Sequence, residues 1–175
     1  MSNVFFISDL HLGHKKILEF SPMRGGTCVV THSEWLVQQW NSVVRKQDLV
    51  WVLGDVCFDQ DHMKYLKQMN GVKHLIFGNH DNFGIDYYKH FFNKIHGFVK
   101  YKGFWLSHAP VHPDELRGQI NIHGHVHHKT IKIKRPYYND FYLETDKRYI
   151  NACVESNMGV PISLEYVINQ RNIDI

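Results

Sequence analysis

Three short apolar runs, each followed at once by polar residues, constrain the fold of this chain more than any other feature of its sequence. The runs occupy residues 4–7, 49–53 and 74–77, and a glycine directly follows the second and the third. Continuous apolar runs of this length are typical of strands that are buried on both faces. We therefore expect three central strands with polar residues at their carboxyl ends.

Helical patterns lie between these runs. Ser33 is expected to cap a helix that places Leu36 and Trp40 on one face. A shorter helix is expected around Met63 and Leu66. Strands and helices that alternate in this way predict a parallel α/β core.

The second half of the chain has the pattern of strands with few helices between them. The runs expected to form strands cover residues 104–106, 120–122, 130–134, 149–154 and 162–167. Together the two halves predict an α/β fold in which two packed mixed β-sheets form a β-sandwich core flanked by helices. No repeat, low-complexity tract or linker interrupts the chain, so residues 1–175 are expected to form a single domain.

Composition narrows the class of protein. Hydrophobic residues make up 43% and charged residues 21% of the 175 residues, as in a globular protein. No apolar stretch is long enough for a membrane-spanning helix, and the N-terminus lacks a signal-peptide pattern, so we expect a cytoplasmic protein without a membrane partner. A net charge of +3 neither excludes nor favours nucleic acid as a partner. The oligomeric state stays open.

Histidine is the most informative residue type in the composition. The chain has 14 histidines, and four of them lie at positions 123, 125, 127 and 128. Clustered histidines are typical of metal sites. The three cysteines are widely spaced and odd in number, so we interpret them as reduced thiols and not as zinc ligands.

Side chains of the kind that bind metals follow five of the predicted strands. They are Asp9 and His11, Asp55, Asn79 with His80 and Asp81, His108, and the pair His125 and His127. Ligands bind at the carboxyl ends of strands in open α/β sheets, so five segments are expected to bring these side chains to one rim.

This series resembles the five-block signature of the calcineurin-like metallophosphoesterases in both order and rough spacing. The blocks are Asp9-x-His11, Gly54-Asp55, Gly78-Asn79-His80-Asp81, His108 and Gly124-His125-x-His127. They span residues 9–127, about two-thirds of the chain. The opening segment 8–14, Ser-Asp-Leu-His-Leu-Gly-His, further resembles the small single-domain bacterial and phage members of this superfamily.

The resemblance implies two divalent metal ions. By similarity, one ion is held by Asp9, His11, Asp55 and His127. The other is held by Asp55, Asn79, His108 and His125, so that Asp55 bridges the pair. Oxygen and imidazole ligands without a thiolate suit Mn²⁺, which is favoured, and also Fe, Zn, Ni or Co.

The resemblance also implies a mechanism, in which a hydroxide bridging the metals attacks a phosphate ester. His80 would act as the general acid toward the leaving oxygen. A carboxylate should orient His80, and Asp59 and Asp81 are both candidates.

Three further residues are expected near the reaction. His14 and Arg24 are candidate contacts to the substrate phosphate, and Arg24 lies in a loop with proline and glycine that is expected to reach the rim. His123 is expected to be a neighbour of the ligands and not a ligand itself.

Short loops around the rim favour a small phosphodiester or nucleotide-like substrate. A phosphomonoesterase or a phosphoprotein phosphatase is the alternative within the enzymes, although the segment after Asp55 lacks the arginine typical of phosphoprotein phosphatases. The alternative of another class is a catalytically silent, metal-binding scaffold for protein interactions. A retromer subunit of this kind lacks the catalytic histidine, whereas this chain keeps His80.

Overall fold

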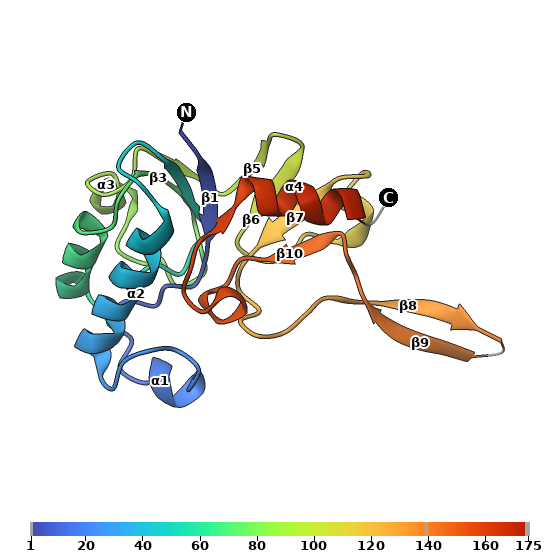
Figure 1. Cartoon of the computed structure of the whole chain (residues 1–175), viewed down its shortest axis with the longest axis horizontal. Coiled ribbons are helices and arrows are strands. Elements are labelled where there is room, and N and C mark those ends of the chain that lie inside the picture. The colour runs from blue at the N-terminus through green and yellow to red at the C-terminus, as the bar shows by residue number, and fades with distance from the viewer. Residues whose placement is uncertain (1, 139, 174–175) are drawn as a thin grey trace.

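The computed structural model describes residues 2–138 and 140–173 (Figure 1). Its strands are β1 (Val4–Ile7), β2 (Leu49–Val52), β3 (Val72–Ile76), β4 (Lys94–His96), β5 (Phe98–Tyr101), β6 (Phe104–Ser107), β7 (Ile120–His123), β8 (Lys132–Tyr137), β9 (Asp140–Thr145), β10 (Tyr149–Asn151) and β11 (Ile162–Ser163). Its α-helices are α1 (Ile17–Phe20), α2 (Val29–Val43), α3 (Ile85–Tyr88) and α4 (Leu164–Ile173). Its 3-10 helices are η1 (Gln60–Lys67), η2 (Pro113–Glu115) and η3 (Val154–Asn157).

The first sheet has five strands in the order β11-β1-β2-β3-β4. Strands β1 to β4 run parallel, and β11 pairs antiparallel with β1. Leu36 and Trp40 of α2 and Leu66 of η1 pack against Val50 and Val52 of β2 in one buried cluster. Helices therefore cover one face of this sheet.

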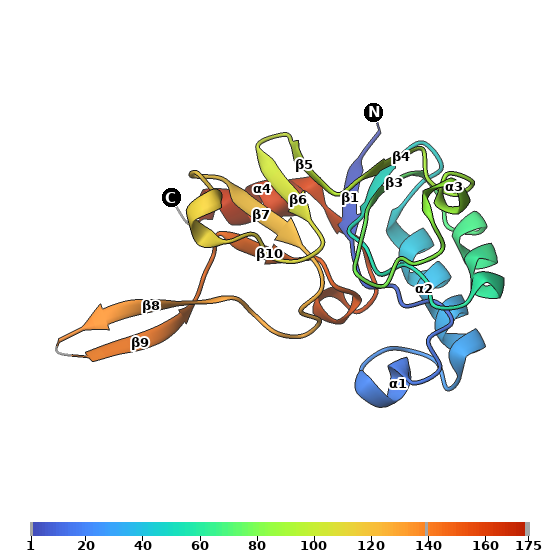
Figure 2. The same ribbon diagram turned by 180° about the vertical axis from the view of Figure 1, so that it is seen from behind.

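The second sheet has four strands in the order β10-β7-β6-β5 and covers the other face of the first (Figure 2). Side chains alternate along β2, so that Trp51 belongs to a second buried cluster with Phe6 of β1. Phe104 and Leu106 of β6 complete the contact between the sheets. The predicted fold class, two packed mixed sheets flanked by helices, is confirmed.

Strands β8 and β9 form a separate hairpin that extends away from the two sheets (Figure 1). The sequence predicts a strand over residues 130–134, but β8 covers Lys132–Tyr137. The hairpin carries the exposed aromatic side chains of Tyr137, Phe141 and Tyr142.

Helix α2 begins before the predicted position. It starts at Val29, so Ser33 lies inside the helix and does not cap it. The Ser33 hydroxyl instead donates to the carbonyl of Val29 and lies 2.9 Å from Nδ1 of His62 on η1. Ser33 therefore joins α2 to η1 within the layer that covers the first sheet.

The prediction of a strand over residues 162–167 is wrong after Ser163. The backbone N–H of Tyr166 donates to Oγ of Ser163 at 3.1 Å, which is the contact of a helix cap, and α4 follows directly. Strand β10 likewise ends at Asn151, before the predicted end at residue 154, and η3 follows. In both places helical backbone follows a strand that is shorter than predicted.

Strand β3 carries a buried cation on the face that packs against α2. Lys73 pairs with Val50 across the sheet, and its ammonium group donates to the carbonyl of Gly71. Burial lowers the pKa of Lys73 to about 8. The unfolded chain therefore binds this proton more tightly than the folded one, and the charge opposes folding fully below about pH 8 and progressively less as the pH rises to 10.5.

Lys73→Met should raise the free energy of unfolding at pH 7 by about 1 kcal/mol, because methionine fills a similar space without a buried charge. The gain should shrink as the pH rises from about 8 toward 10.5, because the folded protein is already neutral at Lys73 and the unfolded chain increasingly loses the same proton. Urea unfolding at pH 7 and pH 10 measures both effects. Lys46→Met, at an exposed position, is the control and should change little. A gain independent of pH would contradict this account.

Candidate metal centre

The candidate ligands lie at the carboxyl ends of the parallel strands. Asp9 follows β1 and Asp55 follows β2, each within three residues of the strand end. Asn79 follows β3 in the same way, and His108 comes directly after β6. The two sheets therefore bring their ligand-type residues to one edge of the molecule, where His125 follows β7.

The first cluster consists of Asp9, His11 and His127. One donor atom from each residue lies within 4.8 Å of the others. Nε2 of His11 is 3.5 Å from Oδ1 of Asp9, and Nε2 of His127 is 3.9 Å from the same oxygen. Asp9 and His11 are buried, and His127 is half-buried.

The second cluster consists of Asp55, His108 and His125, with Asn79 beside them. Nε2 of His108 lies 3.4 Å from Oδ1 of Asp55. Oδ1 of Asn79 lies 2.8 Å from Nε2 of His108 and 3.0 Å from Nδ1 of His125. Four donor atoms therefore converge on a second point.

Asp55 lies between the two clusters. Its Oδ2 is 3.7 Å from Nε2 of His11, whereas its Oδ1 faces Nε2 of His108. Each oxygen of one buried carboxylate is thus directed at a different cluster. This is the arrangement that a bridging ligand requires.

The hydrogen bonds around the clusters indicate that cations belong there. Nδ1 of His108 lies 2.8 Å from the carbonyl oxygen of Leu53, which can only accept, so Nδ1 carries the proton. In a neutral ring the Nε2 lone pair then faces the oxygens of Asn79 and Asp55. Acceptors that face one another at these distances repel unless a positive charge lies between them, so the residues fit a metal pair.

The carboxylates of the site also favour positive charge on or near the histidine rings. The hydrogen bond to Glu155 raises the pKa of His127 despite the burial of the ring. Burial lowers the pKa of His108, but the hydrogen bond and charge of Asp55 outweigh it and raise the pKa. A site that draws protons onto its imidazoles will also attract divalent cations.

The backbone is strained at the candidate ligands. Nine non-glycine residues of the described chain have a positive φ, and five of them are candidate ligands. Those five are Asp9, His11, Asp55, His125 and His127, with φ values from 49° to 70°. Left-handed backbone at residues other than glycine costs free energy and concentrates at functional sites.

Glycine allows two of these segments to approach closely. A Cβ at Gly124 would overlap Oγ of Ser8 and Oδ2 of Asp9. The next residue, His125, donates its backbone N–H to the same Asp9 oxygen at 2.8 Å. A Cβ at Gly78 would similarly overlap Oδ1 of Asp55.

Asp81 does not orient His80. Its carboxylate accepts the backbone N–H groups of Asp55, Val56 and Gly78 at 2.8–3.0 Å, and also the Tyr88 hydroxyl. Asp81 therefore holds the two loops that carry Asp55 and Asn79.

Asp59 does not orient His80 either, because its carboxylate caps η1 by accepting the backbone N–H of Asp61. Among the described residues, no carboxylate hydrogen-bonds to the His80 ring. The expectation of an orienting carboxylate is therefore not met by Asp59 or by Asp81.

His80 lies exposed at the rim. Its backbone N–H donates to Oδ1 of Asp55 at 2.9 Å, so its position depends on the same carboxylate. Its ring centroid is 5.0 Å from that of Phe58 and 6.1 Å from that of His11. The side chain thus stands beside the clusters without being part of them.

His14 and His123 lie near the clusters on different sides. His14 is half-buried at the rim, with its ring centroid 5.8 Å from that of His11. His123 is buried at the end of β7, and its Nδ1 lies 2.9 Å from the carbonyl of Gly124. His123 is therefore a neighbour of the segment that carries His125 and His127.

Arg24 does not reach the rim, which corrects the prediction that it contacts the substrate. Its guanidinium group is fully buried and pairs with Glu155, with Nη2 at 2.6 Å from Oε1. The same Glu155 oxygen lies 3.0 Å from Nδ1 of His127. Sequence reasoning assigned no role to Glu155, although the segment 151–155 resembles the small bacterial and phage members of the superfamily, because no local spacing links this residue to His127 or Arg24.

The thiol of Cys153 also touches the first cluster. Its Sγ donates to Oδ2 of Asp9 at 3.2 Å. Burial raises the pKa of Cys153 well above the usual range, so the group stays a thiol and acts as a hydrogen-bond donor. Cys28, Cys57 and Cys153 are all free of disulfides.

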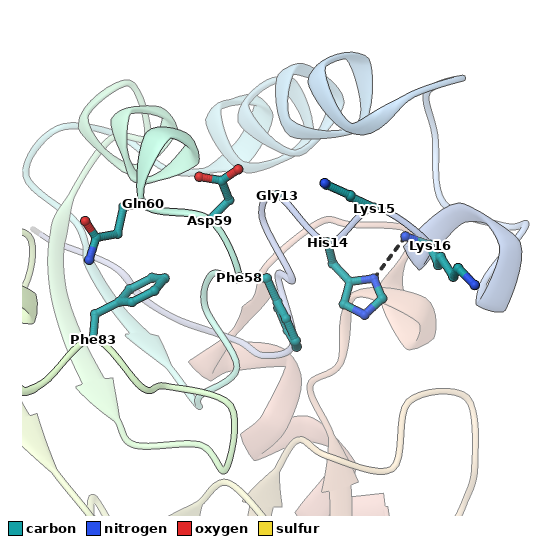
Figure 3. Close-up of a pocket in the computed structure, with 8 residues that line it drawn as sticks. All are labelled: Gly13, His14, Lys15, Lys16, Phe58, Asp59, Gln60 and Phe83. Carbon is teal, nitrogen blue, oxygen red and sulfur yellow. Dashed lines mark hydrogen bonds between the residues drawn. The ribbon is translucent and has the colours of Figure 1, made fainter.

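Two hollows open beside the clusters. One, of about 530 Å³, lies over His11, His80 and His127. The other, of about 610 Å³, is lined on one side by Phe58 and Phe83 and on the other by lysines (Figure 3). Phe58 and His14 line both hollows, so the two are neighbours.

Comparison with known proteins places the chain in a family. No family model matches it. The uncharacterized protein MJ1445 of Methanocaldococcus jannaschii is 32% identical over 174 residues, which cover 96% of this chain and 90% of that protein. The chain belongs to the family of MJ1445. The gene 66 proteins of mycobacterium phages L5 and D29 are 42% and 41% identical over 86 residues, 46% of this chain and 41% of each phage protein.

Two solved structures resemble the fold. A protein of unknown function from Aquifex aeolicus, AQ665, has a TM-score of 0.70 and 26% identity, with 99% of this chain and 98% of that chain covered. Zinc-complexed Vps29 from Entamoeba histolytica has a TM-score of 0.41 and 16% identity, with 85% and 72% covered. The first supports the fold over the whole chain, and the second is too distant to support an assignment. Within the described residues, no helix is both long and apolar enough to cross a bilayer.

Gly124→Ala should weaken metal binding by about 10–100-fold, the usual effect of disturbing groups that hold ligands in place. The added Cβ would displace Asp9 or the segment that carries His125. Calorimetric titration of metal-stripped protein with Mn²⁺ measures the change. Gly97→Ala is the matched control, because a Cβ there meets no atom within 4 Å. Equal affinities in the two variants would contradict the geometry of the centre.

Proposed function

We propose that this chain is a dinuclear metal-dependent phosphoesterase that hydrolyses a small phosphodiester or nucleotide-like substrate. The observation that carries the proposal is the position of Asp55, whose two oxygens face two separate donor clusters. Metal pairs bridged by one carboxylate suit the in-line displacement of a phosphate ester. The resemblance of the sequence to the calcineurin-like metallophosphoesterases supports the same assignment.

In this proposal Asp9, His11, Asp55 and His127 hold one divalent ion. Asp55, Asn79, His108 and His125 hold the other. The donor set contains oxygen and nitrogen atoms and no thiolate. Such a set suits Mn²⁺, which we favour, and also accepts Fe, Zn, Ni or Co.

The bound metals would supply Lewis acidity and a water nucleophile that is active near neutral pH. The chain itself would supply the proton for the leaving oxygen from His80. This ring is exposed, adjoins the hollow over the clusters and is held through its own backbone N–H by Asp55. Those properties suit a general acid that must reach a bound ester.

The shape of the rim supports a small substrate with an aromatic part. In the neighbouring hollow, Phe58 stands between Phe83 and His14 (Figure 3). Its ring is 37% exposed and adjoins that of His80, so an aromatic group stacked on Phe58 would lie next to the general acid. Lys15 and Lys16 line the same hollow and complement a phosphate.

Two alternative functions, a phosphomonoesterase and a metal-binding scaffold, predict different activity toward phosphate esters. A phosphomonoesterase would hydrolyse an activated monoester faster than the matching diester. A metal-binding interaction scaffold would bind two metals and hydrolyse neither ester. Measuring the turnover of both esters by the Mn²⁺-loaded protein distinguishes a phosphodiesterase, a phosphomonoesterase and a scaffold.

Asp55→Ala should abolish both metal binding and hydrolysis, because it removes an oxygen from each donor cluster. Asn79→Ala should chiefly affect the second cluster, yet it should also abolish turnover, since the mechanism needs both ions. Metal analysis together with ester turnover measures these effects. Near wild-type turnover in either variant would overturn the proposed ligand set.

His80→Ala should leave two metals bound and slow turnover by roughly 10²–10⁴-fold, the usual contribution of a positioned acid or base. His90→Ala, an exposed histidine on the turn after α3, is the control and should keep wild-type turnover. Loss of a metal from His80→Ala would show instead that His80 is a ligand. Unchanged turnover would remove it from the mechanism.

A further inference from the structure

We propose that Glu155 and Arg24 form a buried positioning pair for the first cluster, in which Glu155 orients His127 and Arg24 holds the Asp9 loop. The proposal rests on the metal centre described above. It assigns no contact with the substrate to either residue. It instead makes metal affinity at one of the two sites depend on residues outside the ligand set.

Glu155 presents one oxygen to three side chains. Its Oε1 accepts from Nδ1 of His127 at 3.0 Å and from the Ser21 hydroxyl at 2.9 Å. It also accepts from Nε and Nη2 of Arg24 at 2.8 and 2.6 Å. Both members of the ion pair are fully buried.

The bond to His127 sets which nitrogen faces the metal site. A carboxylate at Nδ1 keeps the proton there, so that Nε2 keeps its lone pair. That Nε2 is the atom that faces Asp9 in the first cluster. Carboxylate–histidine–metal arrangements of this kind fix the ring and increase its basicity toward the ion.

Arg24 uses all five of its N–H groups within the protein. Besides Glu155, its Nη2 donates to the carbonyl of Asp9 at 2.8 Å and its Nη1 to the carbonyl of Leu10 at 3.1 Å. The remaining Nη1 hydrogen faces Nε2 of His32 at 3.5 Å. Burial and the charge of Arg24 lower the pKa of His32 to about 3, so this ring is a neutral acceptor.

These bonds hold the strained loop after β1. Asp9 and His11 both have left-handed backbone, and the carbonyls that Arg24 binds belong to Asp9 and to Leu10 between them. Arg24 therefore links the loop to Glu155, which is 131 residues away in the sequence. The pair connects two ligands, Asp9 and His127, that come from different sheets.

Stability alone does not account for the pair. Buried ion pairs contribute little net stability, because desolvation offsets their attraction. Oε2 of Glu155 is moreover buried with no hydrogen-bond partner among the described residues, which adds a cost. The geometry therefore points to a role at the ligands that Oε1 and the guanidinium group touch.

The test uses Glu155→Gln in the full chain, with Mn²⁺ titrated calorimetrically into metal-stripped protein. Wild type should take up two ions. The variant should keep one site unchanged and lose about 10–100-fold in affinity at the other. Asp146→Asn, which breaks the Arg148 pair away from the centre, is the matched control and should keep both affinities.

The double variant Arg24→Met/Glu155→Gln guards against a folding defect, because it removes both buried charges together. It should show the same selective loss at one site, with a cooperative unfolding transition. Wild-type affinity at both sites in either folded variant would overturn the proposal, and so would uptake of fewer than two ions by wild type. Two ions without ester hydrolysis would refute only the proposed function.

Discussion

The repulsion among converging acceptor atoms is the constraint on which the rest of this structure depends. Carboxylate oxygens, an amide oxygen and imidazole nitrogens approach to 2.8–3.9 Å at the carboxyl edge of the two sheets. Hydrogen bonds elsewhere on two of the rings, from His108 to Leu53 and from His127 to Glu155, turn lone pairs toward these oxygens. Positive charge inside such a cluster relieves the repulsion, and the two candidate metal-binding groups are where that charge would lie.

The packed sheets and buried hydrogen bonds hold the ligand residues in place against this repulsion. Two sheets packed through Phe6, Trp51 and Phe104 fix the strand ends that carry the ligands. Asp81 accepts three backbone N–H groups and thereby holds two of the ligand loops. Arg24 does the same for the loop after β1. Strained backbone at five candidate ligands persists because the surroundings over-determine it.

Much of this organisation could be predicted from the sequence, since the signals are local. Each ligand follows a strand within a few residues, so an apolar run and the polar group after it suffice to place Asp55 or Asn79. The start of α4 could not be predicted, because residues 162–167 fit the pattern of a strand, whereas Ser163 caps a helix. The Arg24–Glu155 pair could not be predicted either, because its two residues are 131 positions apart in the sequence and no local pattern connects them.

The central claim is that Asp55 bridges two metal ions. Anomalous diffraction from crystals of the Mn²⁺-loaded protein tests it most directly, because the signal locates each ion without reference to activity. The account predicts two peaks about 3.5–4 Å apart, one on each side of the Asp55 carboxylate. A single peak, or two peaks that do not share Asp55, would contradict it.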